Sequence, residues 1–259
     1  MKILAIIGSP RSKGNTYRTV SRIEERMKQQ GEVEFDYLFL KEANLKPCIG
    51  CNLCLLKGED RCPLKDDRAD IERRMHEADG VIFATPTYVL NVSALMKNFC
   101  DRFAYASHRP RFFKPAMAVS TTGAMGAELV SFIMDLMAGS WGFDIVSKVS
   151  ALTPVDGENY LHKDMKKYNS GLEKSLAKAS ERFYAAVRQG RRQPGVFPIA
   201  QFLLRKASFL KAPADDFDRV YFEQNGWLKP DAKYFFEIRA GPVKIAGARG
   251  LEALLRRFA

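Results

Sequence analysis

The sequence predicts an α/β fold in which helices cover both faces of a parallel sheet. Strand-like and helix-like patterns alternate along the first 190 residues with short connections, which is typical of a doubly wound parallel sheet. The first strand-like run, residues 3–7, is continuously apolar, as expected of a strand that is covered on both faces. With 259 residues, of which 46% are hydrophobic, the chain is long enough for one large α/β domain, or for a somewhat smaller domain with an appendage.

The predicted elements follow one another in strand–helix order. After the first strand, residues 16–30 carry Val20, Ile23 and Met27 at helical spacing, and Gly31 ends that helix. Asp66 and Asp67 stand at the start of the second helix, where carboxylates favour the helix dipole. The remaining strands are expected at residues 33–40, 80–85, 115–120 and 143–150, and the remaining helices at residues 66–78, 92–105, 127–138 and 165–189. Ligands of such a sheet bind beyond the carboxyl ends of its strands, so the loops that follow strands are the candidate site.

The loop at residues 8–16, GSPRSKGNT, has the composition of an anion-binding turn. A helix that starts just beyond a buried strand leaves unpaired N–H groups and a positive dipole end facing outward, and Asn15 and Thr16 are residue types that cap helices. The glycine spacing is neither that of a Walker loop nor GxGxxG, so the loop suits a terminal monophosphate, with an ordinary strand-to-helix connection as the alternative. Side-chain donors and one cation are supplied by Ser9, Ser12, Asn15, Thr16 and Arg11.

This loop resembles the flavin-phosphate loop of the NADPH-dependent FMN reductase and iron–sulfur flavoprotein families. Residues 78–101 resemble the second flavin loop of these families, with Asp101-Arg102 similar to its Asp-Arg ending, and residues 119–128, VSTTGAMGAE, resemble the third. The resemblance covers residues 1–150 well and residues 151–187 loosely. It implies a flavodoxin-like fold, a doubly wound five-stranded parallel sheet, here with a C-terminal extension.

The resemblance also implies that the chain binds FMN and uses NADPH or NADH as co-substrate. Thr87 and the backbone N–H groups near Tyr88 would meet the flavin ring, where fixed donors stabilise the negative charge of reduced flavin. Plain turns are the alternative for the second and third loops, and helix capping is the simpler role for Asn91. No catalytic acid or base is expected. The expected FMN-binding residues are Ser9, Arg11, Ser12, Gly14, Asn15, Thr16, Thr85, Pro86, Thr87, Tyr88, Asn91, Thr121, Thr122, Gly123 and Gly126.

Four of the five cysteines, Cys48, Cys51, Cys54 and Cys62, lie within fifteen residues. Two successive gaps of two residues place three thiols on one tight loop, which suits three corners of a [4Fe–4S] cluster, whereas structural zinc more often uses two separated pairs. The spacing resembles the motif of the iron–sulfur flavoproteins, but FMN reductase relatives with the same loop and no established cluster exist. A cluster, free thiols, zinc and a disulfide therefore stay open, and Cys100 is expected in the core.

The end of the chain differs in composition from the part before it. The formal net charge is +11, of which +7 falls in residues 188–259, and Pro and Gly interrupt the chain near residue 194. We expect an FMN-binding domain at residues 1–190 and a basic, aromatic-rich extension at residues 191–259. So many aromatic side chains need burial, and we expect the extension to form the interface of a homodimer or homotetramer. A tail folded onto its own domain and contact of its basic segments with a membrane surface are the alternatives.

The expected function is that of an FMN-dependent NAD(P)H oxidoreductase. Electrons would pass from the nicotinamide cofactor through FMN to a quinone, a flavin or an electron carrier, and in one version through an iron–sulfur cluster. The alternative is a non-enzymatic flavodoxin-like electron carrier, which the basic charge disfavours because such carriers are usually acidic. No nucleic-acid partner is expected. No apolar run approaches the roughly 20 residues that span a bilayer and no signal-peptide pattern is present, so a cytoplasmic location is expected.

Overall fold

The structure is a computed structural model that describes residues 1–153, 165–191 and 193–256. The chain divides into two compact units. The sheet unit comprises Met1–Gly50 and Leu64–Arg192, and the helical unit comprises Cys51–Pro63 and Gln193–Ala259. Three of the clustered cysteines therefore group with the C-terminal segment, an arrangement that the sequence analysis does not anticipate.

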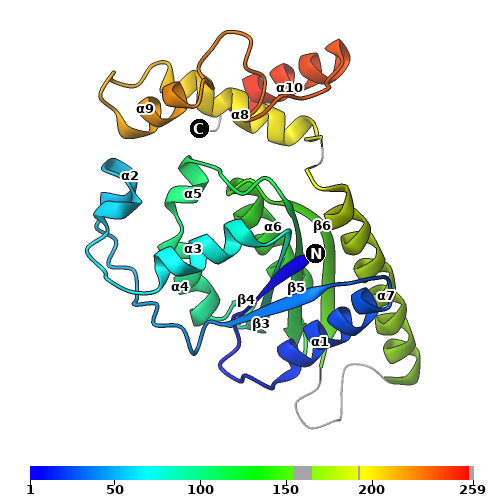
Figure 1. Cartoon of the computed structure of the whole chain (residues 1–259). Helices are drawn as coiled ribbons and strands as arrows, with labels where there is room; N and C mark the ends of the chain where they lie inside the picture. The colour runs from blue at the N-terminus through cyan, green and yellow to red at the C-terminus, as the bar shows by residue number, and fades with distance from the viewer. Residues whose placement is uncertain (154–164, 192, 257–259) are drawn as a thin grey trace. The chain divides into compact units, whose positions relative to one another are not determined.

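The sheet unit is built on five parallel strands in the order β2-β1-β3-β5-β6 (Figure 1), which confirms the predicted flavodoxin-like sheet. A short strand, β4, pairs antiparallel with the end of β3. The strand bounds are β1 Lys2–Ile7, β2 Glu34–Phe39, β3 Gly80–Tyr88, β4 Asn91–Val92, β5 Pro115–Thr122 and β6 Asp144–Leu152.

Helices cover both faces of this sheet because its strands are apolar on both sides. On one face, Ile3, Ala5 and Ile7 pack with Val20 of α1 and Leu176 of α7. On the other face, aromatic rings pack together, with the ring centroids of Phe83 and Phe99 6.3 Å apart and both near Trp141. The helices of the sheet unit are α1 Asn15–Lys28, α3 Arg68–Glu77, α4 Ala94–Arg102, α5 Tyr105–His108, α6 Ala127–Ser140 and α7 Met165–Gln189.

Most predicted elements lie within a few residues of their observed bounds, but the helix expected at residues 92–105 is wrong as a single element. The chain forms α4 and then a separate short helix, α5. The N-cap of helix α4 is Ser93, whose side chain accepts a hydrogen bond from the backbone N–H of Met96 at 3.1 Å. Asn91 lies in β4 instead and does not cap the helix.

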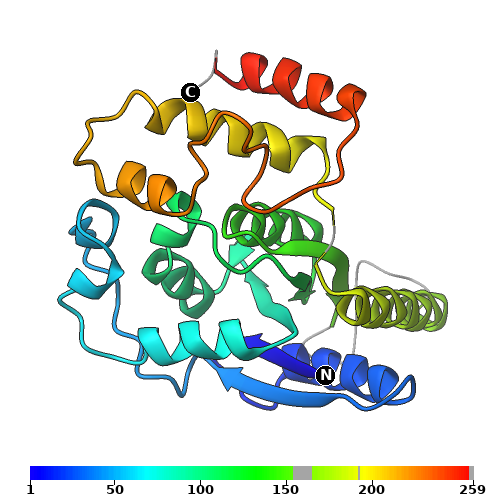
Figure 2. The same ribbon diagram turned by 45° about the horizontal axis from the view of Figure 1, so that its top comes forward.

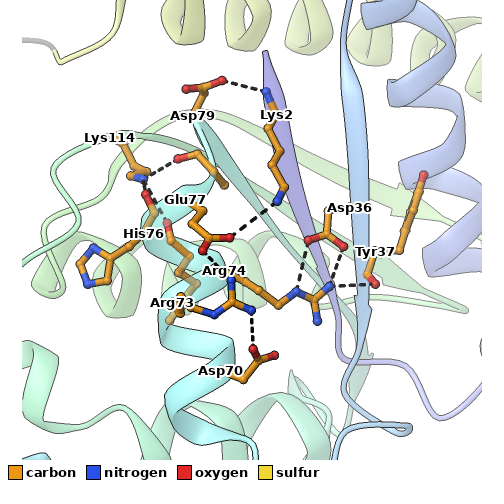
Figure 3. Close-up of polar contacts among 12 residues, drawn as sticks. Lys2, Asp36, Tyr37, Asp70, Arg73, Arg74, His76, Glu77, Asp79 and Lys114 are labelled. Carbon is orange, nitrogen blue, oxygen red and sulfur yellow. Dashed lines mark hydrogen bonds and ion pairs between the residues drawn. The ribbon is translucent and has the colours of Figure 1, made fainter.

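Ion pairs fix helix α3 against the sheet (Figure 3). Arg74 donates to the carboxylate of Asp36 on β2 at 2.6 Å and to the carbonyl of Tyr37 at 3.3 Å. At the C-terminal end of α3, the Lys114 ammonium donates to the carbonyls of Met75 at 3.0 Å and His76 at 2.7 Å, where a cation is favoured by the helix dipole. These contacts hold the C-terminal half of α3 in place.

The helical unit contains α2 Leu53–Leu56, a 3₁₀ turn at Glu59–Arg61, α8 Val196–Phe209, α9 Phe217–Gln224 and α10 Pro242–Leu255. Helices α8 and α10 lie side by side (Figure 2) and bury Ile199, Ala200 and Ala248 between them. Phe222, Trp227 and Phe235 are buried against one another, with ring centroids 4.8–6.0 Å apart. Many of the aromatic residues that the sequence analysis expected at an interface are therefore packed within the helical unit itself.

The cysteine-bearing segment joins the helical unit through helix α9. Helix α2 contacts α9, and a Cβ atom at Gly58 would lie 2.7 Å from the ring of Phe217. Gly58 also has φ +94°, a conformation that favours glycine. Among the residues that the structure describes, no helix is long and apolar enough to cross a membrane.

Candidate functional site

The first predicted loop ends strand β1 and starts helix α1. Ser9 is buried, and its hydroxyl accepts a hydrogen bond from the backbone N–H of Arg11 at 3.1 Å. The N-cap of α1 is Gly14, and no side chain caps the helix, so the capping role predicted for Asn15 and Thr16 is wrong. The uncapped first turn of α1 leaves backbone N–H groups for an anion, and the exposed side chain of Arg11 lies in the loop just before it.

Ser12, in the same loop, is held by an acidic residue. Its hydroxyl donates to the carboxylate of Glu42 at 2.8 Å. An anion that approached the start of α1 would therefore be repelled by the Glu42 carboxylate. To bind that anion, the Ser12 hydroxyl would have to give up its hydrogen bond to Glu42. No sequence pattern indicated this contact, because Glu42 lies 30 residues further along the chain.

The second loop leaves strand β3, where two threonines behave differently. The hydroxyl of Thr85 donates to the carbonyl of Pro86 at 3.0 Å and accepts from the backbone N–H of Ser93 at 3.1 Å, so Thr85 holds the loop in shape. The hydroxyl oxygen of Thr87 is buried and has no hydrogen-bond partner among the described residues. A buried polar atom without a partner is rare and indicates an absent ligand or water.

A tight hairpin follows Thr87 and was missing from the sequence prediction. Tyr88 and Asn91 pair across it, and the Oδ1 atom of Asn91 accepts from the backbone N–H of Val92 at 2.8 Å. Its two central residues, Val89 and Leu90, have φ values of 49° and 61°. Two-residue hairpin turns of this kind are usually made by Asn-Gly or Asp-Gly, so Val-Leu gave no turn signal. The side chain of Val89 is 98% exposed and that of Tyr88 is 49% exposed.

The third loop leaves strand β5 and packs on this hairpin. Thr122 holds the turn, because its hydroxyl donates to the carbonyl of Met125 at 2.8 Å and accepts from the backbone N–H of Ala124 at 3.2 Å. Gly126 has φ +89°, and a Cβ atom there would lie 2.6 Å from the side chain of Leu90. Both the backbone conformation and the close approach therefore require glycine at this position. Gly123 is exposed at the tip of the loop.

The three loops meet at one edge of the sheet. Their strands, β1, β3 and β5, are neighbours, and Pro86 lies opposite Thr121 in the register of β3 and β5. The hydroxyls of Thr16 and Thr121 are 2.8 Å apart. Ser93 donates through its hydroxyl to the carbonyl of Gly8, and this residue, which joins the first and second loops, was not among the predicted site residues. These contacts bring all the predicted FMN-binding segments to the carboxyl edge of the sheet.

The residues present fit an FMN molecule by their chemistry. An uncapped helix start beside a cation suits a phosphate. The partnerless hydroxyl of Thr87 and the backbone N–H groups of the second loop offer donors of the kind that polar ring atoms require. The hydroxyls of Thr85 and Thr122, however, already donate hydrogen bonds to backbone carbonyls of the loops. These two residues therefore stabilise the loops and are not free donors for a ligand.

None of the five cysteines is in a disulfide. Cys48 lies in the sheet unit, and Cys51, Cys54 and Cys62 lie in the helical unit. Within the described residues, no three His, Cys, Asp or Glu side chains come together as a metal-binding group. Burial raises the pKa of the Cys100 thiol to about 12.

Comparison with known proteins places these features in a family. Residues 1–153 match the family described as NADPH-dependent FMN reductase. An iron-sulfur flavoprotein of Archaeoglobus fulgidus is 35% identical over 187 residues, which cover 71% of this chain and 82% of the relative. An iron-sulfur flavoprotein of Methanocaldococcus jannaschii is 42% identical over 102 residues, but the match spans only 39% of this chain and 51% of that relative.

A solved structure supports the fold. RosB with a bound 8-demethyl-8-formylriboflavin-5'-phosphate intermediate aligns with a TM-score of 0.60 at 12% identity, covering 93% of this chain and 92% of RosB. At this identity the likeness concerns the fold. With the family match over more than half of its length, the chain belongs to the NADPH-dependent FMN reductase family.

Proposed function

We propose that the chain is an FMN-dependent oxidoreductase that takes electrons from NADPH or NADH and delivers them to a quinone, a free flavin or an electron carrier. The observation that carries this proposal is the buried, partnerless hydroxyl of Thr87 at the edge where three loops of the sheet unit meet. Bound FMN would supply the hydride and electron-transfer chemistry.

The residues of the chain would bind and orient the cofactor. The first turn of α1 and the Arg11 guanidinium would hold the phosphate, whose charge is about −1.5 to −2 at neutral pH. Thr87 and the backbone around Tyr88 would contact the ring, and Gly123 would leave room for it. Gly126 would let the third loop pack on the hairpin that follows Thr87. Ser9, Ser12, Gly14, Asn15, Thr16, Pro86, Asn91 and Thr121 complete the proposed binding segments. We assign no catalytic acid or base.

FMN titration of two variants tests the cofactor site. A charge-assisted hydrogen bond contributes about 1.5–3 kcal/mol, so Arg11→Ala should weaken FMN binding roughly ten- to a hundredfold. Thr87→Val should weaken it less, because a neutral hydrogen bond is lost. Arg18→Ala is the control, since Arg18 is an exposed cation further along α1. Unchanged affinity in both test variants would contradict the proposed site.

Oxidation of NADPH and NADH by the FMN-loaded protein separates an enzyme from a carrier. An enzyme should turn over many equivalents of nicotinamide in the presence of a quinone or of free FMN. A flavodoxin-like carrier should not be reduced by either nicotinamide at a comparable rate. The family membership favours the enzyme.

We also propose that Cys48, Cys51, Cys54 and Cys62 act together as a cluster-binding set in protein prepared without oxygen. The support is their spacing and the name iron-sulfur flavoprotein that several relatives carry. Among the described residues, no three potential metal ligands are found together. Close to four iron and four sulfide per chain in anaerobic protein would support the proposal. Less than one iron after reconstitution would favour free thiols.

The role of residues 191–259 in assembly is likewise a proposal. Exposed apolar side chains remain on the helical unit, among them Val243 at 85% and Leu254 at 49% exposure. We propose that this unit contributes to a homodimer or homotetramer, with contact of its basic segments with a membrane surface as the alternative. Light scattering of the full chain should give a multiple of 29.3 kDa. A monomer at micromolar concentration would contradict the oligomer, and a vesicle-sedimentation assay would test the alternative.

A further inference from the structure

The segment that carries the clustered cysteines leaves and rejoins the sheet unit at one place. Asn44 and Asp67 exchange two hydrogen bonds, since the backbone N–H of Asn44 donates to the Asp67 carboxylate at 2.7 Å and the N–H of Asp67 donates to the Asn44 carbonyl at 3.0 Å. The N–H of Lys46 donates to the carboxylate of Asp66 at 2.9 Å. Asp66 and Asp67, which are predicted from the sequence to stand at a helix start, thus join the two ends of the cysteine segment.

Arg102 of helix α4 completes this junction. Its guanidinium makes two hydrogen bonds to the Asp66 carboxylate, one of them at 3.0 Å, and a third to the carbonyl of Lys46 at 2.7 Å. The side chains of Arg102 and Asp66 are 2% and 0% exposed. Burial favours the neutral acid, but the hydrogen bonds from Arg102 and from the backbone outweigh it and lower the pKa of Asp66. Removal of one partner of a buried ion pair is strongly destabilising, because the other charge is left buried and unpaired.

Asn98, one turn earlier on α4, holds the first cysteine directly. Its Oδ1 atom accepts from the backbone N–H of Cys48 at 3.1 Å, and its amide group donates to the carbonyl of Leu45 at 3.0 Å. Asp66, Asn98 and Arg102, which we call the anchor, therefore fix the backbone from Leu45 to Cys48.

Helix α4 connects the anchor to the flavin loops. At its start, Ser93 is bonded to Gly8 of the first loop and to Thr85 of the second. A Cβ atom at Gly8 would lie 2.9 Å from Met96 of α4, so loop and helix are in close contact. Arg102 stands nine residues after Ser93, a distance of about 14 Å along an α-helix.

We propose that Asp66, Asn98 and Arg102 are positioning residues that hold Cys48, the first of the clustered cysteines, at a fixed place relative to bound flavin. The inference rests on the proposed function in one respect, because it takes FMN to occupy the three loops. A redox group bound by Cys48 can exchange electrons with the flavin at a defined rate only if the distance between them is defined. The anchor fixes the Cys48 end of that distance through helix α4.

Three variants test the anchor. Arg102→Met removes the ion pair, Asn98→Ala removes neutral hydrogen bonds without leaving a buried charge alone, and Arg102→Lys keeps the charge. Arg73→Met is the matched control, because Arg73 is a 57% exposed arginine with two ion pairs on α3. Hydrogen exchange of the amides of Asn44, Lys46 and Cys48 reports the junction. Energy transfer from FMN to a dye on Cys48, in a background without the other thiols, reports the distance.

In Arg102→Met, the hydrogen-exchange rates of the Lys46 and Cys48 amides should rise at least tenfold. In Asn98→Ala, the rate of the Cys48 amide should rise by the same factor. The distribution of FMN–dye distances should broaden in both variants. Arg102→Lys should largely restore the narrow distribution, and FMN affinity should stay within about threefold of wild type. An unchanged distribution in Arg102→Met and Asn98→Ala would overturn the positioning role even if exchange rises. If the wild-type protein binds no FMN, the proposed function fails, and the exchange measurement still decides whether the anchor holds the segment.

Discussion

The hydroxyl groups of Thr16 and Thr121 are 2.8 Å apart and fully enclosed, although 105 residues separate them in sequence. Thr16 lies in the first turn of α1, and Thr121 lies near the end of β5. This hydrogen bond joins the proposed phosphate loop directly to the loop proposed to receive the flavin ring. The position of one loop therefore depends on the other, even without a ligand.

A double-mutant cycle should show this coupling. Thr16→Val leaves the Thr121 hydroxyl buried without a partner, which costs about 1–3 kcal/mol of the free energy of unfolding. Thr121→Val should cost a similar amount, but the double variant should cost less than the sum of the two, because no unpaired hydroxyl remains. Urea unfolding measures all four proteins. Strict additivity would mean that the two hydroxyls do not interact in solution.

Removal of the negative charge at residue 42 should strengthen FMN binding. The Glu42 carboxylate bonds Ser12 in the proposed phosphate loop and lies near the place of a dianionic phosphate. Glu42→Gln should lower the dissociation constant of FMN by a few-fold at low salt, with a smaller effect at high salt because exposed charges are screened. Glu34→Gln, at an exposed acid on β2, is the control. Weaker binding in Glu42→Gln would show that Glu42 supports the loop instead.

The stabilisation from the buried Arg102–Asp66 pair should depend on pH in a defined window. The pKa of Asp66 is lower in the folded protein than its ordinary value of 3.8, so near that pH the folded state binds fewer protons than the unfolded state. The contribution of the pair to the free energy of unfolding is therefore fully present only above that ordinary value. It is lost as the pH falls through the lowered pKa. The difference in free energy of unfolding between wild type and Asp66→Asn should thus be constant from pH 7 to pH 5 and shrink below pH 4. A difference that already falls at pH 6 would contradict this assignment.

Cys100 should resist alkylation while the clustered thiols react. Its pKa of about 12 leaves roughly a thousandfold less thiolate at pH 8 than an ordinary cysteine has. Peptide mapping after brief iodoacetamide treatment should find Cys48 and Cys51, both exposed, modified and Cys100 intact. Rapid modification of Cys100 in folded protein would show that helix α4 opens readily.

The hairpin after β3 should become more stable with a conventional turn. Val89 and Leu90 hold left-handed backbone angles that cost about 1–3 kcal/mol each. Val89→Asn with Leu90→Gly should raise the free energy of unfolding by about 1 kcal/mol or more. Thermal unfolding measures the change, and Ala94→Gly, in an exposed position of α4, serves as a destabilising reference. A lower melting temperature would show that the two apolar side chains stabilise the fold through their contacts, such as that of Leu90 with Gly126.

The sheet and the order of its loops could be predicted from the sequence, because both depend on local patterns of residues. Apolar runs such as residues 3–7 mark buried strands, and glycine-rich turns mark the loops between strand and helix. The contacts that shape the site are long-range. Neither Ser12 with Glu42 nor Asp66 with Arg102 follows from local propensity, since each pair joins residues 30 or more positions apart.

At two places the local structure departs from what the local sequence indicates, each for a physical reason. Gly14, and not Asn15 or Thr16, caps α1, and this leaves the helix start open where a side-chain cap would close it. The Val89–Leu90 turn lacks the residues that usually signal a hairpin. Both departures fall at the proposed cofactor site, where local rules are most often broken.

The packing of residues 51–63 with the C-terminal helices has a consequence for synthesis on the ribosome. Gly58 contacts Phe217, so the cysteine segment cannot complete its own unit until the last quarter of the chain has been translated. At about 5–20 residues per second, the thiols of a nascent chain spend roughly 10–30 s outside their final surroundings. During that interval Cys51, Cys54 and Cys62 stand on a segment that still lacks its contact with α9, and chaperones can reach it in that form.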